Sequence, residues 1–178
     1  MQSSLYRRVL GHSYESMPSA WRALHDSGSS IWQGRCTVDG GETALARLLA
    51  WLFQLPAEAV DSSITVEFEV SGKGETWTRR VGGRTMRSRQ FVGPRSKPGA
   101  IVEQFGMLAF DLDLPIHDGR VDLVIVAGRC LGFPLPGFLL PRVQAFEHVV
   151  DGRFCFDVTI GLPVAGRLVR YRGWLTDR

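Results

Sequence analysis

The sequence predicts a mostly β protein, in which a curled antiparallel meander forms a barrel or half-barrel packed on N-terminal helices. The 178 residues include 20 Gly and 9 Pro, which favour many turns between short strands. Between residues 63 and 176, apolar and polar residues alternate as they do in half-buried strands. Three dipeptides suited to two-residue hairpin turns divide this stretch: Gly82-Gly83, Asp118-Gly119 and Asp151-Gly152. About nine such strands must curl, and closing them removes their exposed edges.

We expect one domain over residues 1–178, with the helices placed before the meander. Residues 1–28 are predicted as a helical lead-in, and residues 30–39 as a first strand. A helix is clearest at residues 42–55, which are apolar on nearly every side. Such a helix is either enclosed by protein or rests on a membrane surface. Because a large sheet is available, we expect it to be enclosed against the concave side of the sheet.

The hairpin turns also assign side chains to faces, because each turn fixes which residues pair and faces alternate along a strand. The Asp151-Gly152 turn places Glu147 opposite Phe156, on a face that is otherwise apolar. A buried carboxylate is costly unless it is hydrogen-bonded, paired or protonated. The Gly82-Gly83 turn places Arg79 on the inner face, which makes Arg79 the matching partner.

The inner polar residues form the candidate ligand-binding site. It comprises Trp77, Arg79, Glu103, Glu147 and Tyr171, with Glu103 included if its strand faces inward. Two interpretations are open. Glu147 and Arg79 form a structural ion pair, or the group lines a mainly apolar cavity with a few converging polar groups, as small-molecule sites do.

Basic residues are concentrated in one segment. Of the net charge of +3, residues 73–97 contribute +7, from eight basic residues and one acid, which leaves −4 for the remainder. On the outer face of the Gly82-Gly83 hairpin they form a basic face of Arg80, Arg87 and Arg89. This face either attracts an anionic partner or protects an edge strand against aggregation. It carries no interleaved aromatic residues, so a nucleic acid is not the expected partner.

A second apolar feature is the segment at residues 131–141, LGFPLPGFLLP. Its Pro and Gly residues exclude a regular helix or a central strand, although Phe133, Leu135, Phe138 and Leu139 are all apolar. Such a loop caps a barrel mouth, docks a partner, touches a membrane surface or folds back over the core.

Other classes of function lack a signal. No apolar run reaches the length of a membrane span, and the first residues do not resemble a signal peptide. The cysteines Cys36, Cys130 and Cys155 are odd in number and widely spaced, which favours a reduced, cytoplasmic compartment. We find no motif for a nucleotide, a metal or a catalytic serine, and we expect no cofactor and no metal.

Several segments resemble a bacterial family known as domain of unknown function 4166. The similar segments are residues 5–11 (LYRRVLG), 77–80 (WTRR), 103–106 (EQFG), 132–136 (GFPLP), 151–158 (DGRFCFDV), 162–163 (LP) and 171–175 (YRGWL). His148 departs from the pattern, since similar sequences have an aromatic residue there. The resemblance implies no activity, because the family is uncharacterised. Some members resemble C-terminal appendages of saccharopine-dehydrogenase-like reductases, which makes a reductase an expected alternative partner, without a dinucleotide bound to this chain.

Three hypotheses of function follow. The first is a non-enzymatic binding domain for an apolar or amphipathic, lipid-like small molecule. The second is an accessory domain that docks on a partner enzyme through the 131–141 segment or the basic face. The third is an enzyme in which Glu147 is the acid, Tyr171 a hydrogen-bond donor and Arg79 an anion anchor. A cavity of several hundred cubic ångströms would favour the first and third hypotheses over the second.

Overall fold

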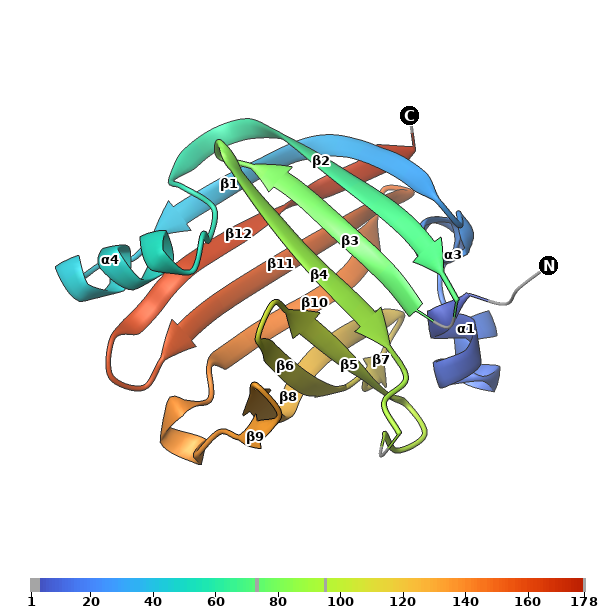
Figure 1. The fold of residues 1–178 in the computed structure, drawn as a ribbon. Helices are drawn as coiled ribbons and strands as arrows, with labels where there is room; N and C mark the ends of the chain where they lie inside the picture. Colours follow the sequence, from blue (N-terminus) through green and yellow to red (C-terminus); the bar gives the residue numbers. More distant parts are fainter. Residues whose placement is uncertain (1–3, 73, 95, 178) are drawn as a thin grey trace.

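The computed structural model describes residues 4–72, 74–94 and 96–177, and within them the chain forms a closed ten-stranded antiparallel barrel (Figure 1). The ten strands are β1 (Ser30–Gly40), β2 (Ala59–Ser71), β3 (Gly74–Val81), β4 (Arg84–Phe91), β5 (Ala100–Phe105), β6 (Leu108–Asp113), β8 (Arg120–Cys130), β10 (Arg142–Val150), β11 (Arg153–Leu162) and β12 (Gly166–Asp177). Two short strands, β7 (Ile116–His117) and β9 (Phe133–Pro134), pair with β8. The barrel predicted from the meander is confirmed.

The barrel closes through a short ladder between β8 and β10. Only three residue pairs join them: Ala145 with Leu123, Phe146 with Asp122, and Glu147 with Val121. A second short ladder, between β4 and β5, also has three pairs. Between the other neighbouring strands of the ten the ladders are longer, and the β10–β11–β12–β1–β2–β3–β4 sheet forms most of the wall.

The three hairpin turns pair their flanking residues as predicted. Val81 lies opposite Arg84, His117 opposite Arg120, and Val150 opposite Arg153. Each turn contains residues with positive φ, which suit Gly and Asp in two-residue hairpins. The register of β10 and β11 places Glu147 opposite Phe156, both buried inside the barrel.

Connections between successive antiparallel strands lie alternately at the two ends of the barrel, and the two ends carry different elements. At the helical end lie α1 (Leu5–Leu10), α2 (His12–Glu15) and α3 (Ser19–Asp26), whose side chains Tyr6, Tyr14 and Trp21 are fully buried in the core (Figure 1). At the opposite end, which we call the open end, lie α4 (Ala44–Leu52), the turns at residues 82–83, 106–107 and 163–165, and the 131–141 segment with the 3-10 helix η1 (Gly137–Leu139).

The expectation that the helix at residues 42–55 is enclosed is wrong. Helix α4 buries only Ala46, against Ala165 and Leu168 of the β11–β12 hairpin. Leu48 is 58% exposed, and most of its apolar neighbours on α4 are exposed as well. The helix lies on the rim because short connections tie it to the end of β1 and the start of β2, while inward side chains of the strands line the interior. No helix within the described ranges is long and apolar enough to cross a bilayer.

This placement predicts a contrast between two positions on α4. Leu48→Asp should change the free energy of unfolding by less than about 0.5 kcal/mol, because the side chain is exposed. Ala46→Asp should cost at least about 3 kcal/mol, because it buries an unpaired charge. Thermal melting followed by circular dichroism measures both variants. Comparable destabilisation by the two would contradict a helix on the rim.

Candidate functional site

A cavity of about 620 Å³ lies inside the barrel. Its wall is mainly apolar and is contributed by both the long sheet and the β5–β8 side. The lining includes Ile64, Val66, Met86, Phe110, Leu112, Leu123, Ile125, Val143, Phe154, Phe156, Val158, Ile160 and Leu175. At the open end the lining continues with Phe53 and Gln54 after α4 and with Leu135 and Leu139 of the 131–141 segment.

All five residues of the predicted ligand-binding site line this cavity: Trp77, Arg79, Glu103, Glu147 and Tyr171. They come from β3, β5, β10 and β12, so strands far apart in sequence bring them to one interior. The structure divides the polar members into two groups, one around Arg79 and one around Glu147.

The first group is an ion pair bridged by a hydroxyl. Arg79 donates from one terminal nitrogen to Ser88 Oγ at 2.8 Å and from the other to Glu103 Oε1 at 3.3 Å. Ser88 in turn donates to the same Glu103 oxygen at 2.7 Å. The guanidinium also lies 4.7 Å from the centre of the Trp77 ring. The pair compensates the charge of Arg79 while other guanidinium N–H groups keep donor capacity.

Tyr171 supplies an unused hydroxyl beside this ion pair. Burial raises the pKa of Tyr171 to about 12, the Arg79 charge opposes that rise, and Glu103 adds to it. The phenol is therefore a neutral O–H donor at neutral pH. Its hydroxyl makes no hydrogen bond with any described residue, which leaves it available to a ligand.

The second group shows that the expected Glu147–Arg79 pair is wrong, because Arg79 pairs with Glu103 instead. Glu147 Oε2 accepts one hydrogen bond from Trp21 Nε1 and another from His25 Nε2, each at 2.9 Å. Both donors lie on α3, at the helical end. Neither residue was among the predicted site residues, although their i, i+4 spacing puts them on one helix face.

Stacked aromatic residues surround the Glu147 group and seal the helical end. Tyr6 and Trp21 pack against the His25 ring with centroids 3.9 and 4.1 Å away. The Tyr6 hydroxyl donates to Gln90 Oε1 at 3.0 Å. Burial, reinforced by Glu147 and two further carboxylates, raises the pKa of Tyr6 well above its ordinary value. The cavity floor is thus closed by hydrogen-bonded aromatic side chains.

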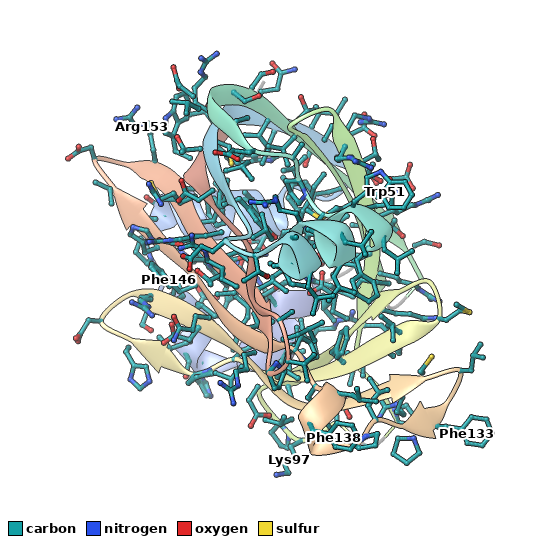
Figure 2. All side chains as sticks on the ribbon, turned by 90° about the vertical axis from the view of Figure 1, so that its left-hand side faces the viewer. Trp51, Lys97, Phe133, Phe138, Phe146 and Arg153 are labelled. Carbon is teal, nitrogen blue, oxygen red and sulfur yellow. The ribbon has the colours of Figure 1, made fainter. Side chains whose placement is uncertain are left out.

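The 131–141 segment divides between the cavity and the surface. Leu135 and Leu139 line the cavity, whereas Phe133 and Phe138 are 75% and 65% exposed. Figure 2 looks onto the open end and shows Phe133 and Phe138 at its lower edge, away from Trp51 of α4. The segment therefore caps part of the mouth and also presents apolar side chains to the surroundings.

The predicted basic face is largely neutralised by β2. Arg80 pairs with Glu67 at 2.7 Å and Arg87 with Glu69 at 3.2 Å. The Arg80 hydrogen bond lowers the pKa of Glu67. Arg89 lies 5.4 Å from the centre of the Phe91 ring. These pairs were not predicted, because no register between β2 and β3 was derived from the sequence, whereas the structure places Ser71 opposite Gly74. The basic Lys73 and Arg95 lie outside the described residues.

Other reactive groups lie away from the cavity lining. Burial raises the pKa of the Cys36 thiol to about 11, so it is not a thiolate at neutral pH. Burial likewise raises the pKa of Cys155. Within the described ranges, no three His, Cys, Asp or Glu side chains form a group that could hold a metal ion.

The chain matches one family model, described as "Domain of unknown function (DUF4166)", over residues 17–175. Among solved structures it is similar to Rv2717c from M. tuberculosis, with 12% identity, a TM-score of 0.48, and coverage of 91% of this chain and 99% of that one. It is also similar to zebrafish ileal bile acid-binding protein in complex with cholic acid, with 14% identity, a TM-score of 0.39, and coverage of 84% and 98%. Both TM-scores are below 0.5. No curated protein matches the chain.

The double acceptor role of Glu147 predicts a split between two substitutions. Glu147→Leu should cost about 2–6 kcal/mol, because the buried Trp21 and His25 donors each lose their acceptor. Glu147→Gln should stay within about 1 kcal/mol of the wild type, because the amide oxygen can still accept both bonds. Chemical denaturation measures these differences, with the exposed Gln144→Leu on the same strand as the control. Near-wild-type stability of Glu147→Leu would contradict the role of Glu147 as the anchor of α3.

Proposed function

The chain belongs to the family described as domain of unknown function (DUF4166), and we propose that it binds one amphipathic small molecule inside the barrel. The cavity of about 620 Å³ is the observation that carries this proposal. Small-molecule sites are typically clefts of roughly 300–1,000 Å³, mainly apolar, with a few polar groups that orient the ligand. An apolar wall without a ligand is in contact with water, so an apolar ligand gains free energy by displacing it.

The polar groups of the cavity indicate which functional group the polar end of such a ligand would carry. Tyr171 offers an O–H donor, Arg79 offers its remaining N–H donors, and Glu147 offers Oε1, which has no hydrogen bond with a described residue. Because Glu103 already compensates Arg79, the polar group around Arg79 does not favour an anion. A neutral hydroxyl, carbonyl or amide suits these donors and acceptors best.

The same geometry weighs against an enzyme in which Glu147 is the acid and Arg79 the anion anchor. Glu147 Oε2 accepts bonds from Trp21 and His25, and Arg79 is committed to Glu103, so both act as structural anchors as well as cavity groups. Docking on a partner enzyme such as a reductase would not need an interior cavity. Binding of a small molecule accounts for both the apolar wall and the unused polar atoms.

The uncharged fluorescent probe N-phenyl-1-naphthylamine should bind in the cavity with enhanced emission. Ile125→Trp adds bulk to the cavity from β8, and should weaken this binding at least about tenfold, a loss of about 1.4 kcal/mol. Val124→Trp is the matched control, because Val124 is the adjacent residue and faces outward, 42% exposed. Equal binding by wild type and both variants in a fluorescence titration would place the probe outside the cavity and overturn the proposal.

The charge of the ligand end is tested with a sulfonated analogue. 8-Anilino-1-naphthalenesulfonate has the same aromatic frame with one negative charge, and should bind at least about tenfold more weakly than the uncharged probe, because burying an uncompensated charge is costly. Competition between the two probes at constant ionic strength measures the ratio. Tighter binding of the sulfonate would contradict the preference for a neutral ligand.

A further inference from the structure

Exposed apolar side chains are concentrated around the mouth of the cavity. They come from four separate connections at the open end: Leu48 and Trp51 from α4, Met107 from the β5–β6 turn, Phe133 and Phe138 from the 131–141 segment, and Val164 from the β11–β12 turn. Trp51 is 57% exposed and Val164 71% exposed. Trp51, Phe133 and Phe138 are separately labelled on the face that Figure 2 presents.

The helical end has a different character. Its buried aromatic side chains face the core, and its exposed large apolar residues among those described are all aliphatic: Ile31, Val70, Val92 and Val150. Among the described residues, every exposed Phe or Trp side chain belongs to the open end. A patch that gathers on one end, and draws on connections far apart in sequence, indicates an interaction surface.

Basic residues accompany this apolar surface. Arg47 on α4, Arg84 beside the β3–β4 turn and Arg142 at the start of β10 have no carboxylate partner among the described residues. Arg167, at the same end, pairs with Glu42 at 2.8 Å. Glu58, before β2, is an exposed acid at this end. The unpaired charges at the open end are therefore mainly positive.

We propose that the open end docks on the surface of an anionic lipid bilayer. Exposed Trp and Phe side chains suit the interface between headgroups and acyl chains. Unpaired Arg side chains suit anionic headgroups. A second copy of the chain is disfavoured, because facing two open ends would oppose like charges. Docking would set the cavity mouth against the lipid, so that an apolar molecule could pass between bilayer and barrel without crossing water.

Vesicle co-sedimentation of the full chain tests the proposal. Binding should occur on phosphatidylcholine vesicles that contain phosphatidylglycerol, weaken on pure phosphatidylcholine, and fall as salt is raised. Trp51→Ser with Phe138→Ser should reduce binding at least about tenfold, since the variant loses two large apolar side chains that would be buried in the bilayer. The matched control is Val92→Ser with Val150→Ser, at the helical end. Brominated lipids should quench part of the tryptophan emission of the wild type, and less of it in the Trp51→Ser variant.

Three results would overturn membrane docking. They are no binding of the wild type to anionic vesicles, unchanged binding by the Trp51→Ser and Phe138→Ser variant, and a concentration-dependent dimer in sedimentation that this variant abolishes. The same variant should keep its binding of N-phenyl-1-naphthylamine in vesicle-free solution. Failure of docking and failure of cavity binding are therefore seen in separate measurements.

Discussion

Glu147 lies where the wall, the closing seam and the helical end of the barrel meet. It belongs to the three-pair ladder between β8 and β10, opposite Val121, and its side chain points inward, where it is 6% exposed. There it accepts hydrogen bonds from Trp21 and His25 of α3. A buried carboxylate is stable only with such partners. The hydrogen bonds that satisfy Glu147 therefore also hold the helices against the barrel wall beside the three-pair β8–β10 ladder.

Because the helices close only one end, the two ends of the barrel are not equivalent. The helical end is filled by stacked aromatic side chains, while the other end carries α4 and the 131–141 segment around a mouth. Between them, the strands leave an apolar interior in which the Arg79–Ser88–Glu103 group and the Tyr171 hydroxyl are the principal polar features. A ligand would enter at the apolar rim of the open end and place its polar end deeper in the cavity. The proposed membrane-docking surface and the proposed ligand site would then lie on one route from the bilayer to the cavity.

Short-range signals in the sequence predicted the wall of the barrel well. The turns at Gly82-Gly83 and Asp151-Gly152 set the registers, and these correctly placed Arg79 and Glu147 inside. The partners of these residues could not be predicted, because His25 is 122 positions from Glu147 and no turn relates them. Helix α4 was misplaced for a related reason. An apolar pattern such as that of Leu45, Leu48 and Leu52 is the same for a helix inside a core and for one on an interaction surface.

Native mass spectrometry of the protein after incubation with a neutral lipid extract tests the central claim most directly. A single non-covalent adduct is expected on the wild type and on the outward-facing Val124→Trp variant, and it should be largely lost from Ile125→Trp. Absence of an adduct on the wild type, or equal occupancy of all three proteins, would contradict an interior ligand site.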